Sequence, residues 1–202
     1  MSKTPAVIQD SFRFMGRFLA APGSVGAVLP SSRFLANMMV RDLELTAGDV
    51  VVEYGPGTGP MTRAIQSLLL QTKGVEYLGI ELDEQFHASL SMRMPDLNFH
   101  LGSVEDVEQI LQDRGLGPVK VIVSGLPFAC LPDGVQTSVV RGSHAVLCPG
   151  GEFRTFQYVH AYPLPAARRF RRKMAAQFRG YVRSAPVIRN VPPAYKLTYR
   201  KS

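Results

Sequence analysis

The sequence predicts an α/β fold with a mostly parallel sheet and helices on both faces. Short apolar runs alternate with helical patterns along most of the chain, which is typical of consecutive strand–helix units. A glycine-rich turn links the first strand to the first helix of this series, within residues 49–65 (DVVVEYGPGTGPMTRAI). The final twenty residues instead suggest two adjacent strands about a VPPA turn, which predicts an antiparallel hairpin at one edge.

The glycine-rich turn has the composition of a ligand-binding loop. The apolar run 50–52 ends at Glu53, and three alternating glycines follow, Gly55, Gly57 and Gly59. Glycine is needed where the backbone adopts positive φ or approaches a ligand closely. The helix that begins after the loop offers unpaired N–H groups to a polar or anionic ligand. The spacing is GxGxG, which differs from the GxGxxG of dinucleotide-binding proteins.

A second acid follows at a distance that suits a nucleoside ligand. The segment VEYLGIELD predicts a strand over residues 75–80 that ends in Glu81, some twenty residues beyond the glycines. A carboxylate at this place can accept hydrogen bonds from both hydroxyls of a ribose. Glu81 is therefore the strongest single candidate for a cofactor contact after the loop itself.

The rest of the chain continues the alternation of predicted strands and helices. A helix is predicted after Ser31 or Ser32, either of which suits an N-cap. Further helices are predicted over residues 60–71, 83–92, 104–114 and 134–146, and strands over 98–101, 119–123 and 150–159. We expect a single domain over residues 1–202, with an N-terminal helical or lid segment (1–40) and an α/β core (48–202).

Composition narrows the class of protein. No run of 18 apolar residues occurs, and the first residues lack the apolar core of a signal peptide. The two cysteines, Cys130 and Cys148, are too few for a disulfide framework or a zinc site, so we expect reduced thiols and no metal.

The charge is unevenly distributed, which points to an anionic partner. The net charge is +7, and residues 153–202 hold 12 of the 23 basic residues and none of the 16 acidic ones. Within this part, Phe170, Met174 and Phe178 share one helical stripe among arginines, which is typical of a membrane-surface or polyphosphate-binding helix. Residues 5–21 form a second amphipathic pattern, with phenylalanines on the apolar face. Both patterns are also typical of helices that pack on their own domain or face solvent.

With these motifs placed, the chain resembles the bacterial phospholipid N-methyltransferases, which are themselves similar to the rRNA adenine dimethyltransferases in their cofactor region. The segments that carry the resemblance are VGAVLPSSRFLANMM, VVEYGPGTGPMTRAI, YLGIELDEQF, VSGLP and RNVPPA. These segments lie between residues 25 and 194. The resemblance implies the seven-stranded, Rossmann-like fold of class I methyltransferases.

The resemblance also implies a cofactor and its contacts. The cofactor is S-adenosylmethionine (SAM), and the product is S-adenosylhomocysteine. The residues at the matching positions are Glu53, Tyr54, Gly55, Gly57, Gly59, Glu81, Leu82, Ser103, Val104 and Ser124. Ser103 stands where such enzymes commonly have an acid that contacts the adenine amino group, which leaves that contact open.

The implied acceptor is the amine of phosphatidylethanolamine and of its mono- and dimethyl forms. Ser124 and Tyr158 are the candidate catalytic residues, with His160 as a second candidate for handling the proton of the amine. The candidate substrate-binding residues are Pro30, Ser31, Gly125, Leu126, Pro127, Tyr158, Arg183 and Arg189. We expect a cytoplasmic enzyme bound peripherally to the inner face of the membrane through anionic lipid, and no nucleic-acid partner.

Three alternatives remain at this level. An rRNA adenine methyltransferase shares the glycine loop and the basic surface, but it normally has an asparagine-containing acceptor motif where this chain has SGLP. A methyltransferase of a small amine or lipid-like metabolite would need the same cofactor loop. A non-catalytic SAM- or lipid-binding protein would also keep it, since cofactor binding does not prove turnover.

Overall fold

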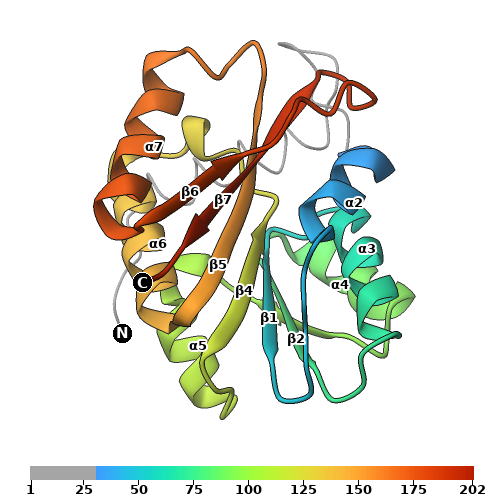
Figure 1. Cartoon of the computed structure of the whole chain (residues 1–202). Coiled ribbons are helices and arrows are strands. Elements are labelled where there is room, and N and C mark those ends of the chain that lie inside the picture. Colours follow the sequence, from blue (N-terminus) through green and yellow to red (C-terminus); the bar gives the residue numbers. More distant parts are fainter. Residues whose placement is uncertain (1–30) are drawn as a thin grey trace.

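The computed structural model describes residues 31–202, which form one seven-stranded sheet covered by helices on both faces (Figure 1). The strands are β1 (Val50–Tyr54), β2 (Glu76–Glu81), β3 (Asn98–Leu101), β4 (Val119–Ser124), β5 (Leu147–Tyr158), β6 (Gly180–Arg183) and β7 (Ala194–Arg200). The helices are α2 (Arg33–Val40), α3 (Pro60–Leu69), α4 (Glu84–Arg93), α5 (Val107–Asp113), α6 (Asp133–Val146) and α7 (Pro165–Gln177). Two 3-10 turns are η1 (Val104–Asp106) and η2 (Phe128–Cys130).

The sheet has the order β3-β2-β1-β4-β5-β7-β6. Strands β1 to β5 pair in parallel, while β7 is antiparallel to both β5 and β6. The strand order reverses between β1 and β4, which are neighbours. Ligands of open α/β sheets bind outside the carboxyl ends of the strands at such a switch point. The predicted fold, including its antiparallel edge, is confirmed.

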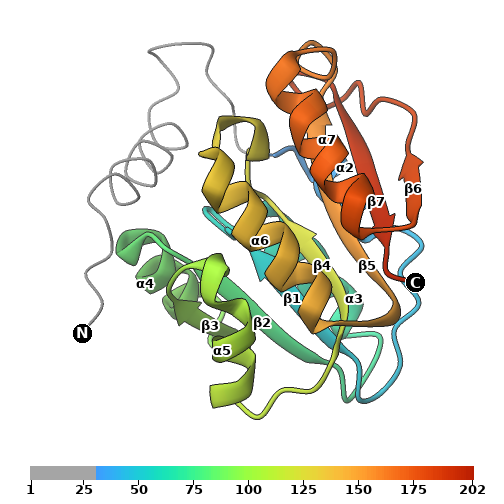
Figure 2. The same cartoon turned by 90° about the vertical axis from the view of Figure 1, so that its left-hand side faces the viewer.

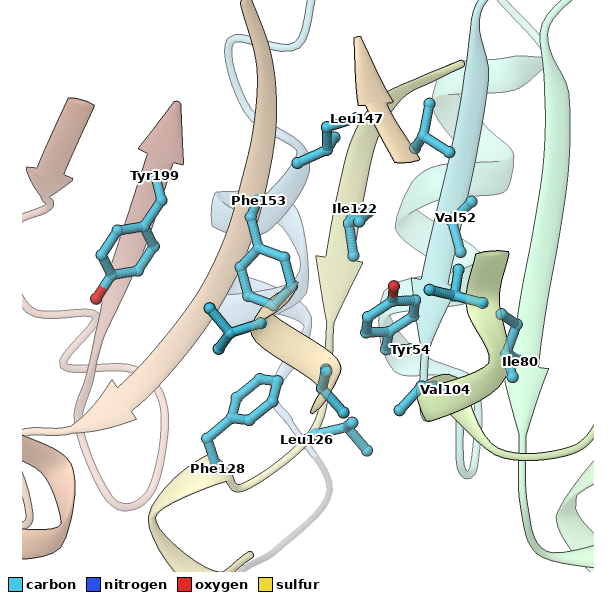
Figure 3. Packing of buried hydrophobic residues seen from close by; sticks show 14 of the residues in the cluster. Val52, Tyr54, Ile80, Val104, Ile122, Leu126, Phe128, Leu147, Phe153 and Tyr199 are labelled. Carbon is cyan, nitrogen blue, oxygen red and sulfur yellow. The ribbon is translucent and has the colours of Figure 1, made fainter. Parts of the chain in front are cut away.

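Two apolar cores lie on the two faces of the sheet. Helices α2, α3 and α4 cover one face, and α5, α6 and α7 cover the other (Figures 1 and 2). The second face is rich in aromatic residues, with Tyr54 and Phe153 packed edge to face between the sheet and its helices (Figure 3). Phe128 stacks on Phe170 of α7 with 4.4 Å between the ring centroids, and this contact fixes η2 against that helix.

Helix α2 is held to the sheet at both ends. At its start, the Ser32 N–H donates to Asn190 Oδ1 at 2.9 Å, across 158 residues of sequence. At its end, the buried guanidinium of Arg154 on β5 donates to the carbonyls of Met39 and Arg41 at 3.0 and 2.7 Å. These carbonyls have no partner within the helix, so Arg154 satisfies them. Glu152 neutralises Arg154, with 2.6 Å between Nη2 and Oε2.

Two element boundaries differ from those predicted. Strand β5 starts at Leu147 rather than at residue 150, because Leu147 already pairs with Val119. The register between β4 and β5 then shifts, and the two glycines of PGG lie in this irregular part. The last two strands are joined by ten residues, 184–193, rather than by a tight VPPA turn. Asn190 explains this longer connection, because it brings the segment to α2. The amphipathic pattern 5–21, the loop before α2 and Pro30 lie outside the described residues.

The carboxyl ends of β1 and β4 meet so closely that a side chain would not fit between them. The Gly125 N–H donates to the carbonyl of Tyr54 at 2.8 Å, and a Cβ at Gly125 would lie 2.8 Å from the carbonyl oxygen of Gly55. The chain therefore needs glycine at position 125 for the two loops to approach each other.

We predict that Gly125→Ala lowers the free energy of unfolding by about 1–3 kcal/mol, because the backbone must shift to relieve the overlap. Urea denaturation followed by circular dichroism measures this change. Gly117→Ala is the matched control, since a Cβ there meets nothing within 4 Å. Equal stability of the two variants would contradict the close approach described here.

Candidate active site

The glycine loop after β1 has the backbone conformation that its spacing predicts. Gly55, Gly57 and Gly59 have φ values of 63°, 58° and 85°, all in the left-handed region that disfavours other residues. Gly59 is the N-cap of α3, and Pro60 occupies the first helical position, where its missing N–H costs no hydrogen bond. The loop thus turns sharply from strand to helix, and its residues 55–58 line a cleft.

Glu81 holds this loop in place from the neighbouring strand. Its Oε2 accepts a hydrogen bond from the Gly57 N–H at 2.8 Å, and its Oε1 accepts one from the Asp83 N–H at 3.0 Å. The side chain is only 7% exposed, and burial raises the pKa of its carboxyl, although the two backbone donors oppose this shift. Each oxygen retains a second lone pair, so the carboxylate can still accept ligand hydroxyls.

Glu53, at the end of β1, has one oxygen with a partner and one without. The Tyr77 hydroxyl donates to Oε2 at 2.6 Å, whereas no donor among residues 31–202 reaches the buried Oε1. Burial raises the pKa of Glu53 to about 7, and the Tyr77 hydrogen bond together with the nearby Thr62 offsets only part of this effect. An unpaired buried carboxylate oxygen is costly unless a ligand supplies a donor.

A small cleft of about 50 Å³ lies over these groups. It is lined by Ser31, Glu53, Gly55, Pro56, Gly57, Thr58, Pro60, Met61, Phe86 and Gly125. The cleft is much smaller than SAM, and it is the chemistry of its groups that fits this cofactor: the Glu53 oxygen without a partner among residues 31–202 can pair with the ammonium of its methionine part, and Glu81 can bind its ribose. Leu82 follows Glu81 and is 38% exposed, so it offers an apolar surface to the adenine.

Two predicted contact residues point away from the cleft. The Tyr54 side chain is fully buried on the α6 face, where its hydroxyl lies 3.2 Å from Ser143 Oγ, so only its backbone lies near the glycine loop. Ser124 is also fully buried, and its Oγ accepts a hydrogen bond from the Leu126 N–H at 3.2 Å. In this structure the Ser124 hydroxyl stabilises the turn, and the catalytic role expected of it stays a prediction.

Ser103 and Val104, which follow β3 and were expected to contact the cofactor, lie in different surroundings. Ser103 is the N-cap of η1, with its Oγ accepting from the Glu105 N–H at 3.2 Å. Val104 is buried in the core beneath it. Ser103 is partly exposed, so its hydroxyl remains available as a donor, whereas Val104 contributes through packing.

The acceptor loop SGLP joins β4 to η2 beside the cleft. Gly125 lines the cleft, Leu126 is buried against Gly55, and Pro127 precedes η2 and is partly exposed. Tyr158, at the end of β5, is partly buried, and its ring stacks on His160 with 5.8 Å between centroids. Burial raises the pKa of Tyr158 to about 12, which favours the neutral phenol at neutral pH.

The two candidate arginines belong to different clusters. The Arg189 guanidinium lies 5.0 Å from the ring centroid of Phe34 on α2, close to the Ser31 side of the cleft. Arg183 instead lies over the rings of Tyr162 and Tyr195, at 5.1 and 4.7 Å. Arg189 is therefore the better placed of the two to meet a substrate at the cofactor cleft.

Three supporting residues were not predicted from the sequence. Phe86 lines the cleft from the first turn of α4, and Tyr77 pairs with Glu53 from the middle of β2. Asn190 joins the RNVPPA segment to α2 through its contact with Ser32. Only Phe86 had a local signal, since it follows Glu81 and the Asp83 cap closely. The other two contacts depend on how distant elements meet.

Glu53 should make the stability of the protein depend on pH. The pKa of Glu53 in the folded protein lies above its ordinary value. Its contribution to the free energy of unfolding is therefore fully present below the ordinary pKa and is lost as the pH rises through about 7. We predict that the free energy of unfolding falls between pH 5 and pH 8 by up to about 3 kcal/mol more in the wild type than in Glu53→Gln. Urea denaturation at each pH gives this difference. The exposed Glu84→Gln is the control, and parallel pH profiles for the wild type and Glu53→Gln would refute the assignment.

Comparisons with known proteins agree with this site. The chain is 34% identical over 190 residues to the ornithine lipid N-methyltransferase of Singulisphaera acidiphila, an alignment that covers 93% of this chain and 94% of that protein. It is 38% identical over 102 residues to ribosomal RNA small subunit methyltransferase A of Opitutus terrae, covering 46% of this chain and 35% of that protein. No family model matches the chain.

Among solved structures, the fold resembles that of Aeropyrum pernix fibrillarin with natively bound SAM. The TM-score is 0.61 and the identity 15%, over 83% of this chain and 74% of that one. The cofactor of this site is SAM, and the fold is that of class I SAM-dependent methyltransferases. The extent and identity of the first match show that the chain belongs to the same family as the ornithine lipid N-methyltransferase of Singulisphaera acidiphila.

Proposed function

We propose that the protein transfers a methyl group from SAM to the primary amine of a membrane-lipid headgroup. The observation that carries this proposal is the extent of the alignment with the ornithine lipid enzyme. The alignment covers 93% of the chain and so includes the acceptor side as well as the cofactor loop. The rRNA enzyme matches less than half of the chain. That alignment therefore gives less support to an RNA substrate.

The acceptor chemistry is shared by two lipids. Ornithine lipid, the substrate named for the relative, and phosphatidylethanolamine, the acceptor that the family resemblance implies, both combine a primary amine with an anionic group. Arg189 beside the cleft suits the anion, because a guanidinium pairs well with either a carboxylate or a phosphate. We favour the ornithine headgroup, since a full-length relative supports it.

The residues around the cleft would act mainly by positioning. SAM supplies a methyl group that its sulfonium charge already activates. Gly125 and Leu126 bring the acceptor loop against the glycine loop, which would set the amine close to the cofactor. The neutral Tyr158 phenol would accept a hydrogen bond from the amine and fix its direction, while the exposed His160 beside it is suited to pass the released proton to water.

Exposed apolar side chains at the same edge of the sheet support work at a membrane surface. The segment 184–193 connects β6 to β7 at the carboxyl edge of the parallel strands, near α2 (Figure 1). In it, Ile188 is 75% exposed and Val191 is 65% exposed, on either side of Arg189. Within the described part of the chain, no helix is long and apolar enough to cross a membrane. We propose peripheral binding at the inner face of the membrane, with this segment inserted among the lipids.

A transfer assay tests the proposed reaction. The purified protein is incubated with methyl-labelled SAM and, separately, with vesicles containing ornithine lipid, vesicles containing phosphatidylethanolamine, rRNA or a soluble primary amine. We predict label in the ornithine lipid, with less in phosphatidylethanolamine and none in RNA. Label confined to RNA or to the soluble amine would overturn the proposal. SAM binding by calorimetry without any transfer would indicate a non-catalytic binding protein.

The membrane contact has its own test. We predict that Ile188→Ser combined with Val191→Ser weakens binding to anionic vesicles roughly tenfold or more, because each apolar side chain contributes on the order of 1.5–3 kcal/mol when fully buried. Sedimentation with vesicles measures the bound fraction. The control is Leu70→Ser with Met92→Ser, which removes side chains 80% and 82% exposed at the ends of helices that run toward the opposite edge. Equal loss in both double variants would exclude the segment 184–193 as the membrane contact.

A further inference from the structure

A second cleft lies between α7 and the edge of the sheet, away from the cofactor loop. It has a volume of about 370 Å³ and is lined by Arg168, Arg171, Arg172, Ala175, Tyr181 and Tyr199. Helix α7 supplies the first four of these residues, and β6 and β7 supply the tyrosines (Figure 2). The volume is within the range of small-molecule sites and far exceeds that of a phosphate ion. No step of the proposed methyl transfer uses these residues.

Arg171 is fixed in the wall of this cleft. Its Nη1 donates to Gln157 Oε1 at 2.6 Å and to the Tyr162 carbonyl at 2.9 Å, and its guanidinium lies 3.7 Å from the Tyr162 ring centroid. These contacts occupy one nitrogen and orient the whole planar group. The remaining N–H groups can bind an oxyanion with little further loss of side-chain freedom.

Within the described part of the chain, no acid pairs with the arginines of the cleft. The whole segment from residue 153 onward lacks Asp and Glu. Lys173, by contrast, turns to α6 and pairs with Asp133 at 2.8 Å. The three arginines therefore create a local excess of positive charge that favours an anion.

Tyr199 provides an independent sign of a ligand. It is 1% exposed, and its hydroxyl is buried with no hydrogen-bond partner among the described residues. The hydroxyl of its neighbour Tyr181 differs, since it lies 2.8 Å from the Tyr162 hydroxyl. A buried hydroxyl without a partner costs stability, and a ligand oxygen in the cleft would satisfy it. Burial also raises the pKa of Tyr199, so the phenol stays protonated and can donate.

We propose that this cleft binds the phosphate of an anionic phospholipid headgroup, at a site separate from the methyl acceptor. The arginines and the Tyr199 hydroxyl would hold the phosphate oxygens. Ala175, the tyrosine rings and the arginine stems would contact the glycerol and the first acyl carbons, because the cleft offers more apolar surface than an inorganic ion requires. Arg168 lies in the first turn of α7, near the carboxyl edge of the sheet, whereas Tyr181 and Tyr199 lie toward the opposite edge.

Calorimetry with a soluble lipid tests this site without methyl transfer. The probe is dihexanoylphosphatidylglycerol below its micelle concentration, compared with dihexanoylphosphatidylcholine and inorganic phosphate. We expect saturable binding of the anionic lipid, weakened about 100-fold in Arg168→Ala/Arg172→Ala by the loss of two charged donors. The control is Arg169→Ala/Arg179→Ala, which removes equal charge from exposed positions outside the lining of the cleft.

Tyr199→Phe separates a ligand contact from a structural one. We expect it to weaken lipid binding about five- to tenfold while leaving the urea midpoint unchanged or higher, because the hydroxyl has no partner among residues 31–202 to lose. Absence of saturable binding, or equal weakening in the control pair, would overturn the proposal. Inorganic phosphate or the zwitterionic lipid binding as tightly as the anionic lipid would also overturn it. None of these outcomes depends on whether the protein methylates ornithine lipid.

Discussion

The buried carboxylate of Glu81 is the group on which the site depends. It sits at the end of β2 and accepts hydrogen bonds from the Gly57 N–H of the preceding loop and from the Asp83 N–H at the start of α4. A carboxylate this deeply buried needs such donors, so its position and the loop conformation fix each other. The loop in turn sets the start of α3 and brings Gly55 against Gly125 of the acceptor loop. One side chain thus links the ends of three neighbouring strands.

The parts of the site from distant regions of sequence are joined by a few long-range contacts. Asn190 ties the segment between β6 and β7 to the start of α2, and Arg154 ties the end of the same helix to β5. Ser31, just before α2, lines the cleft, and Arg189 lies over Phe34 of that helix. Because the exposed Ile188 and Val191 belong to the same segment as Asn190, the contacts that build the cleft also place an apolar surface next to it. This arrangement suits an enzyme whose acceptor lies in a membrane.

Local sequence patterns predicted the fold and much of the cofactor side. Alternating glycines predict positive φ, and an acid after a buried strand predicts a ribose contact, so Gly57 and Glu81 were accessible from short stretches. The positions of the Tyr54 and Ser124 side chains could not be predicted in this way, because the place of a residue in a motif does not tell on which face of the sheet its side chain lies. The Asn190 contact spans 158 residues, and no local pattern encodes such a pairing. The predicted helix 5–21 and the single-domain division stay predictions.

A crystal structure with bound S-adenosylhomocysteine would show directly how the site holds the cofactor. We predict that both ribose hydroxyls donate to the Glu81 carboxylate and that the ammonium of the ligand lies within hydrogen-bond distance of Glu53 Oε1, the oxygen without a donor among residues 31–202. The glycine loop should keep its left-handed conformation at Gly55, Gly57 and Gly59. A ligand bound elsewhere, or one whose ribose does not contact Glu81, would contradict this prediction.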